Sequence, residues 1–152
     1  MWPFKKNASL NILPVEEQKW SVLELESNEL PLLVRLNTSA KDLISHPDLG
    51  IRVGFAIPLL SPNKGGMPEP NENLKLNEIE DFIINAIHET GPMVQALTIT
   101  TGEFKEFVFY IKNSDGIETA HKKAQSAFTE YEIQCMGEHD PEWNTYKEFL
   151  NA

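Results

Sequence analysis

The sequence predicts a single α+β domain, and three observations support this fold class. The chain has 152 residues, close to the roughly 100–150 residues of a typical domain. Its hydrophobic residues, 41% of the total, are sufficient to form a core. Their spacing alternates along the chain between the two-residue period of strands and the period of about 3.6 residues of helices.

The first part of the chain predicts a β-hairpin. Strand-like segments at 19–26 and 32–37 flank residues 27–29, which have the composition of a turn. Residues 1–18 precede the hairpin, and we expect them to form a flexible N-terminal segment. A strand at 51–59 follows, because apolar and small or polar residues alternate there.

Two helices, three strands and a short terminal helix follow. After a loop rich in proline and glycine, apolar residues recur at helical spacing from about residue 74, and Gly91-Pro92 ends this helix. Asn77 and Glu80 have the spacing of a capping box, with a start one turn earlier as the alternative. The other expected elements are strands at 93–101 and 104–112, a helix at 115–128, a strand at 131–136 and a terminal helix that begins at Asp140-Pro141.

From residue 51 the order is strand, helix, strand, strand, helix, strand. This βαββαβ order is typical of the ferredoxin-like split βαβ fold, here with an N-terminal β-hairpin and a short C-terminal helix. We expect one domain over residues 19–152. The C-terminal motif is interpreted as structural, with Asp140 as a helix cap and Trp143 and Tyr146 on the apolar side of the terminal helix.

The two faces of the predicted sheet differ in character. Both helices of this fold cover one face, and we expect odd-numbered residues to supply it with apolar side chains. These are Val53, Phe55, Ile57, Leu97, Ile99, Phe107, Phe109, Ile111, Tyr131, Ile133 and Cys135. The opposite, outer face is mixed, with the small residues Gly54 and Ala56 at its centre. The sequence does not decide what covers the outer face. The candidates are the protein's own terminal helix or N-terminal hairpin, a second subunit, and a bound partner.

The outer face supplies the candidate interaction or ligand residues, which are Arg52, Glu106, Tyr110 and Gln134. A cross-strand ion pair between Arg52 and Glu106 is the simpler expectation. The alternative is a polar site in which a tyrosine or carboxylate has a perturbed pKa.

The charge distribution indicates a class of partner. The chain has 13 basic and 23 acidic residues, a net charge of −10. Residues 1–66 hold seven of each, so the entire excess lies in residues 67–152. An acidic surface disfavours nucleic acid as a partner and attracts basic proteins. Solubility is the alternative explanation.

Sequence motifs of catalysis or metal binding are absent. There is no nucleophile elbow, phosphate-binding glycine loop, dinucleotide fingerprint or His-Glu-x-x-His helix. The single cysteine, Cys135, excludes an internal disulfide and a multi-cysteine metal cluster. Glu138-His139-Asp140 offers metal-binding atoms, but adjacent residues rarely converge on one ion, so a solvated turn is expected. We therefore expect no catalytic residue, metal or cofactor.

The sequence also lacks a secretory signal pattern and any run of about 20 apolar residues. These observations favour a cytoplasmic protein without membrane contact.

Two segments resemble the signature segments of a bacterial family known as domain of unknown function 695. They are TTGEFKEFVFY at 100–110 and DPEWNTYKEFL at 140–150. Residues 30–37, 66–68 and 77–81 also fit the family pattern, although Lys105 stands where the family usually has arginine. The resemblance extends from about residue 20 to 150 and implies no assigned catalysis. Occasional association with domains similar to the RNase E inhibitor suggests, by analogy, an acidic protein that modulates a basic partner.

Taken together, the sequence favours a non-enzymatic binding or regulatory module over an enzyme. It would act by contact with a basic protein partner or as a homodimer. The alternative is a small-molecule-binding or hydrolytic protein with a polar site on the outer sheet face.

Overall fold

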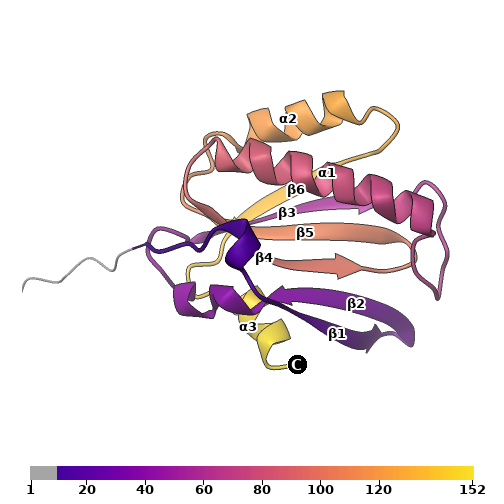
Figure 1. Ribbon diagram of the computed structural model, residues 1–152, viewed down its shortest axis with the longest axis horizontal. Coiled ribbons are helices and arrows are strands. Elements are labelled where there is room, and N and C mark those ends of the chain that lie inside the picture. The colour runs from indigo at the N-terminus through magenta and orange to yellow at the C-terminus, as the bar shows by residue number, and fades with distance from the viewer. Residues whose placement is uncertain (1–9) are drawn as a thin grey trace, which may run out of the picture.

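Six strands form one antiparallel sheet in the computed structural model, which describes residues 10–152 (Figure 1). Their order across the sheet is β1-β2-β4-β5-β3-β6. The strands are β1 (Trp20–Ser27), β2 (Leu30–Asn37), β3 (Ile51–Pro58), β4 (Met93–Thr100), β5 (Phe104–Ile111) and β6 (Gln134–His139).

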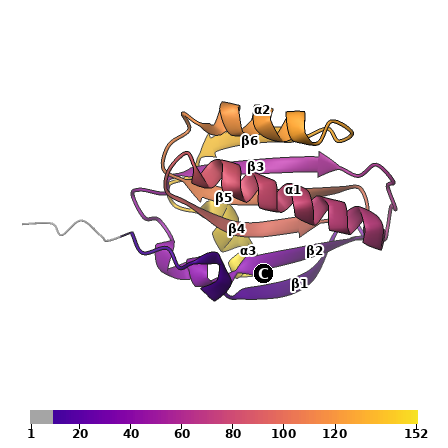
Figure 2. The same ribbon diagram turned by 45° about the horizontal axis from the view of Figure 1, so that its top comes forward.

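Helices lie on both faces of this sheet. The two longer ones, α1 (Pro70–His88) and α2 (Ile117–Ala127), cover one face. The short helix α3 (Asn144–Leu150) lies on the opposite, outer face, behind the sheet in Figure 2. Two 3-10 turns, η1 (Val15–Glu17) and η2 (Thr38–Leu43), flank the first hairpin. The α+β class predicted from the sequence is confirmed.

The sheet is larger than the four-stranded core that the sequence predicts, because the N-terminal hairpin joins the same sheet. Strand β2 pairs with β4 from Leu33 opposite Thr100 to Leu36 opposite Leu97. Asn28 and Glu29 form the tight turn between β1 and β2, with φ values of 53° and 66°. A two-residue turn with two left-handed residues matches the twist of the strands that it joins.

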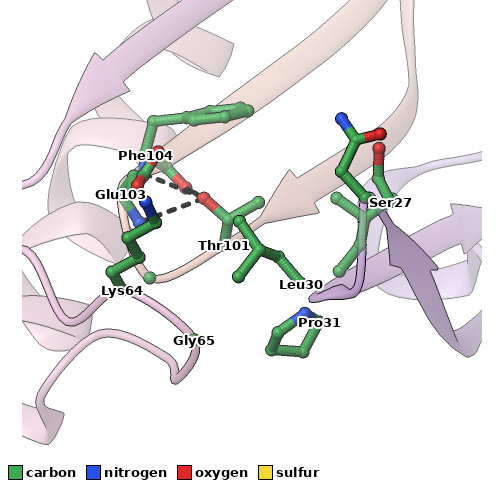
Figure 3. Close-up of a pocket in the computed structure, with 11 residues that line it drawn as sticks. Ser27, Leu30, Pro31, Lys64, Gly65, Thr101, Glu103 and Phe104 are labelled. Atoms are coloured by element: carbon green, nitrogen blue, oxygen red, sulfur yellow. Dashed lines mark hydrogen bonds between the residues drawn. The ribbon is translucent and has the colours of Figure 1, made fainter.

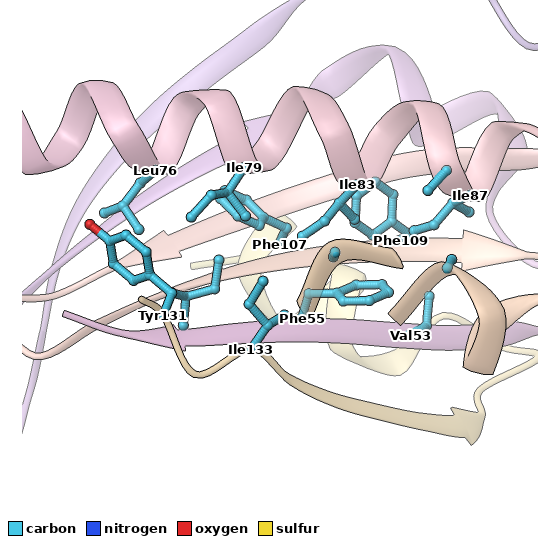
Figure 4. Packing of buried hydrophobic residues seen from close by; sticks show 14 of the residues in the cluster. Val53, Phe55, Leu76, Ile79, Ile83, Ile87, Phe107, Phe109, Tyr131 and Ile133 are labelled. Carbon is cyan, nitrogen blue, oxygen red and sulfur yellow. The ribbon is translucent and has the colours of Figure 1, made fainter. Parts of the chain in front are cut away.

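The hydrophobic core between the sheet and the two long helices follows the predicted pattern (Figure 4). Odd-numbered residues of β3 and β5 and of the segment before β6 point to this side. They pack against Ile79, Ile83 and Ile87 of α1, all buried. Each large apolar side chain that is fully buried contributes about 1.5–3 kcal/mol to folding.

Strand β4 departs from the predicted parity. Leu97 and Ile99 were expected under the helices, but they pack in the cluster on the outer face. The cause is a β-bulge: Gln95 lies opposite Phe109 and Leu97 opposite Val108, so Ala96 is an extra residue in β4. Every β4 side chain after Ala96 therefore faces the side of the sheet opposite to the one that its odd or even number predicts.

Three predicted boundaries also need correction. Helix α1 begins at Pro70, where a proline in the first turn costs no hydrogen bond, so Asn77 is not a cap. Strand β6 spans 134–139 instead of 131–136, because Tyr131 and Ile133 pack into the core before the pairing with β3 begins. Helix α3 begins at Asn144, since residues 140–143 form a turn closed by the Trp143 amide donating to the Asp140 carbonyl (3.0 Å).

The second cluster lies on the outer face and is covered by the chain itself. Trp143 and Tyr146 are buried there with Val34, Leu36 and Val108. In the segment that the sequence assigns to the N-terminus, Leu10 and Ile12 also pack against this cluster; residues 1–9 lie outside the described part of the chain. Within residues 10–152, no helix has the length and apolar character needed to cross a membrane.

Candidate functional site on the outer face

Tyr110 lies at the covered end of the outer face and is fully buried. Trp143 stacks on its ring, with centroids 4.0 Å apart and planes 10° apart. The Tyr110 hydroxyl donates to Asp140 Oδ2 (2.7 Å) and accepts from the Tyr146 amide (3.3 Å). Burial, followed by the hydrogen bond to Asp140, raises the pKa of Tyr110. This side chain fixes α3 to the sheet and has no exposed surface for a ligand.

Asp140 is the centre of this polar contact. Its carboxylate accepts from the backbone amides of Asn144 (2.9 Å) and Thr145 (3.3 Å), which belong to the first turn of α3. Burial alone would raise the pKa of Asp140, but the bonds from Tyr110 and from these amides, with Arg52 nearby, hold it below its ordinary value. Asp140 is not the residue directly before the helix, which the sequence predicts it to be, because Trp143 occupies that position; its carboxylate instead holds the first turn of α3 from four residues upstream.

Arg52 pairs with Glu138 on β6 instead of Glu106. The register explains this: Arg52 lies opposite Tyr110 on one side and Glu138 on the other. A second contact, 3.8 Å long, joins its Nε to Asp140 Oδ2, and this buried Nε has no hydrogen-bond partner among residues 10–152.

Glu106 lies opposite Ala56, and its carboxylate extends over Gly54. A Cβ atom at Gly54 would stand 2.5 Å from Glu106 Oε2, so Glu106 itself uses the close approach that Gly54 permits. Burial raises the pKa of Glu106, with the charge of Arg52 opposing the shift. A partly buried carboxylate with a raised pKa is a recognised mark of functional surfaces.

The other end of the outer face is open. We call it the open patch, and its residues are Ala56, Pro58, Phe104, Glu106, Gln134 and Met136. A hollow of about 390 Å³ is lined by the first five of these and Glu103. Gln134 is exposed and donates to Glu132 (3.3 Å), and Met136 has 71% of its surface exposed. Of the four residues predicted from the sequence, Glu106 and Gln134 belong to this patch.

A buried polar cluster under α1 was not predicted. Lys105, only 4% exposed, donates to Asn73 Oδ1 (3.2 Å) and Asn77 Oδ1 (3.4 Å). Burial lowers the pKa of Lys105, and the nearby Glu80 opposes this shift. Glu80 in turn accepts from Gln95 Nε2 (2.7 Å). Gln95 lies before the bulge and keeps the odd-numbered orientation toward the helices, whereas the bulge at Ala96 turns Thr98 toward the same carboxylate, with 3.5 Å between Thr98 Oγ1 and Glu80 Oε2.

A second feature that the sequence did not indicate is a pocket at the turn end of the sheet (Figure 3). It has a volume of about 260 Å³, and we call it the turn pocket. Its walls are the β1–β2 turn, the loop after β3 and the β4–β5 turn. The lining residues are Ser27, Asn28, Leu30, Pro31, Leu32, Lys64, Gly65, Thr101, Gly102, Glu103 and Phe104.

Residues 10–152 contain no cluster of three or more histidine, cysteine, aspartate or glutamate side chains placed to hold a metal ion. His139 lies in β6 opposite Ile51 and is exposed, while Asp140 is used by Tyr110 and α3.

Comparison with known proteins places the chain in a family. A model described as "Family of unknown function (DUF695)" matches residues 18–151, nearly the whole chain, so the chain belongs to this family. Neither the curated proteins nor the solved structures gave a match.

Proposed function

We propose that this member of the family of unknown function DUF695 is a non-enzymatic binding module that holds a basic protein partner on the open patch. The observation that carries the proposal is an exposed apolar side chain, Met136, surrounded by carboxylates at the free edge of the sheet.

The apolar part of the patch is suited to a partner side chain. Met136 lies opposite Gly54, over which the Glu106 carboxylate extends, and Gln134 lies opposite Ala56, so a carboxylate and small residues border the exposed thioether. Methionine adapts its shape to different apolar groups and makes favourable contacts with aromatic rings. Apolar surface with a polar rim is typical of an interaction site, and Pro58 and Phe104 add apolar surface to that of Met136 in the open patch.

The charge around the patch favours a basic partner. Glu103 and Glu132 are exposed around it, and Arg52, a nearby cation, is balanced by its ion pair with Glu138 and its contact with Asp140. A cationic side chain placed over Glu106 would stabilise its ionised form and so offset the cost of burying that carboxylate. The same field accelerates the encounter with positively charged surfaces.

The backbone of β6 offers further contacts. Strand β6 is the last in the sheet, and the Asp140 amide donates to the Gly50 carbonyl across the β3–β6 pair (2.9 Å). The antiparallel alternation then directs the N–H and C=O groups of Cys135 and Gly137 away from β3. An extended partner segment can add to such an edge as a further strand.

A homodimer through the same edge is less favourable on electrostatic grounds. An antiparallel pairing of two β6 strands would bring Glu132 and Glu138 of one copy near the same carboxylates of the other, and like charges across a strand pair destabilise it. A basic partner carries no such penalty.

The test uses two extended peptides of equal length, one alternating lysine and valine, the other glutamate and valine. We expect the lysine peptide alone to bind, with affinity falling as salt rises from about 0.05 to 0.5 M. Glu132→Lys and Met136→Ser should each weaken it about tenfold, or 1.4 kcal/mol.

Matched controls lie on other surfaces. Val22→Ser removes an exposed apolar side chain of β1 (61% exposed), and Glu118→Lys reverses a charge on α2. Both should bind like the wild type. Equal binding of the two peptides, or equal losses in the controls, would contradict the proposal. Self-association that Met136→Ser abolishes would favour a homodimer instead.

We also propose that β3, α1, β4, β5, α2 and β6 form a ferredoxin-like split βαβ unit. The neighbour order β4-β5-β3-β6, with each adjacent pair antiparallel, supports this assignment. An experimental structure of the chain tests it directly, and any other neighbour order among these four strands would contradict it.

A further inference from the structure

The turn pocket has fixed walls, as a preformed binding site requires. Residues 63–66 form a turn in which the Gly66 amide donates to the Asn63 carbonyl (2.8 Å) and Gly65 has φ 81°. This turn is held against the β4–β5 turn by the Asn63 amide, which donates to the Gly102 carbonyl (2.6 Å). A Cβ atom at Gly102 would stand 1.8 Å from the Asn63 carbonyl oxygen, so only glycine permits this contact.

The β4–β5 turn is fixed from within as well. The Thr101 hydroxyl accepts from the amides of Glu103 and Phe104, both at 3.1 Å. Figure 3 shows Thr101, Glu103 and Phe104 on the side of this turn, with Ser27 and Pro31 from the first hairpin facing them. The polar groups of Thr101 are therefore occupied with shaping the wall.

The remaining polar side chains of the turn pocket are unpaired. Lys64 and Glu103 carry opposite charges and line the same cavity, but neither forms an ion pair or side-chain hydrogen bond with a residue in the described range 10–152. The same is true of Ser27 and Asn28. Between these groups the wall is apolar, formed by Leu30, Pro31, Leu32 and Phe104.

We propose that the turn pocket binds a small apolar α-amino acid in its zwitterionic form. The carboxylate of the ligand contacts Lys64, its ammonium group contacts Glu103, and its side chain packs on Phe104. The unpaired charges of the pocket sum to zero, so a zwitterion can pair with both Lys64 and Glu103, whereas a simple anion or cation pairs with only one of them. The volume is below the roughly 300–1,000 Å³ of pockets for drug-sized molecules, which also favours a ligand of this size.

The experiment titrates the ¹⁵N-labelled full chain with L-leucine and follows the backbone amide signals. Two analogues remove one charge each: N-acetyl-L-leucine lacks the ammonium group, and L-leucinamide lacks the carboxylate. We expect L-leucine to shift the amides of residues 64–65 and 101–104 and to saturate below about 10 mM. Each analogue should bind at least about tenfold more weakly.

Two variants assign the contacts. Lys64→Met should lose the preference for leucine over leucinamide, and Glu103→Gln the preference for leucine over N-acetyl-leucine. Both side chains are exposed, so the variants should retain the wild-type fold, which circular dichroism checks. Lys122→Met, at an exposed position on α2, is the control and should bind like the wild type.

Three results would overturn the proposal: no saturable shift with L-leucine, equal affinity for leucine and its analogues, or unchanged preferences in Lys64→Met and Glu103→Gln. This inference and the basic-partner proposal can fail separately, because Lys64 lines the turn pocket and not the hollow of the open patch, and Met136 lies outside the turn pocket.

Discussion

Trp143 provides the sharpest test of how the outer face is covered. Its side chain is fully buried, stacks on Tyr110 at 4.0 Å and meets Tyr146 edge-on at 5.3 Å. Its indole N–H donates to the Leu49 carbonyl (2.8 Å). Removing a buried tryptophan costs about 3–5 kcal/mol, which is a large fraction of the roughly 5–15 kcal/mol that stabilises a typical domain.

The backbone conformation of Trp143 has a second effect on stability, which partly offsets the loss of the side chain when the replacement is glycine. Trp143 has φ 60° and ψ 41°, in the left-handed region, which costs a residue with a side chain about 1–2 kcal/mol and glycine almost nothing. We therefore expect Trp143→Gly to be more stable than Trp143→Ala by about 1 kcal/mol. In ordinary helix or strand positions the order is reversed, since glycine is the less stable residue by about 0.5–1 kcal/mol.

The assay is urea denaturation followed by far-ultraviolet circular dichroism, with the free energies of unfolding compared at equal slopes. Trp143→Ala should lose about 3–5 kcal/mol, which lowers the melting temperature by about 6–20 °C for a chain of this size. A loss below 1 kcal/mol would show that Trp143 does not cover the sheet. An alanine variant more stable than the glycine variant would refute the left-handed conformation.

Four further substitutions test the polar contacts of buried and partly buried side chains. In a double-mutant cycle of Tyr110→Phe and Asp140→Asn, urea denaturation should give a coupling free energy of about 1.5–3 kcal/mol. Because the folded-state pKa of Asp140 lies below 3.8, its ionisation stabilises the protein above that pH and the effect is lost as the pH falls further; Asp140→Asn should flatten this acid limb. The pKa of Lys105 is lowered in the folded state, so wild-type stability should rise with pH from that lowered value up to 10.5, and Lys105→Met should abolish the rise. The pKa of Glu106 is raised above 4.5, so Glu106→Gln should increase stability at neutral pH and leave it unchanged in acid below 4.5; an unchanged neutral value would contradict the burial of this carboxylate.

The helix-side core is the part of the fold that the sequence predicts best. In β3 large apolar residues alternate with small or polar ones, so the facing direction of Phe55 follows from its parity. In β5, where residues 107–111 are all apolar, the pairing with β3 places Phe107 opposite Phe55 and on the same face. Strand β4 offers no such guide, because apolar residues occupy both parities there and a one-residue bulge reverses every later side chain. The pairing of β2 with β4 joins segments about 60 residues apart, and the local spacing of apolar residues cannot predict such a pairing.

The sequence predicts which residues lie on the outer face, but it does not predict that one end of this face is covered by α3 and the other is open. The sequence places Tyr110 and Glu106 on one face, and the structure agrees, but α3 covers Tyr110 and leaves Glu106 in the open patch. The covered end depends on Trp143 adopting a backbone conformation that tryptophan rarely takes. The turn pocket depends on contacts among three loops, and sequence periodicity says nothing about how loops meet.

The division of the outer face also determines how the two proposed sites relate. Glu103 and Phe104 line both the turn pocket and the hollow of the open patch, so a ligand in one cavity touches a wall of the other. An amino acid that neutralises Glu103 would weaken the field that attracts a basic partner, and the two ligands should therefore bind with negative coupling. Lys64→Met removes the proposed carboxylate contact without altering the open patch, and Met136→Ser does the converse. If leucine lowers the affinity for the lysine peptide in the wild type, this effect should disappear in Lys64→Met, whereas a persistent effect would place the amino acid on the patch itself.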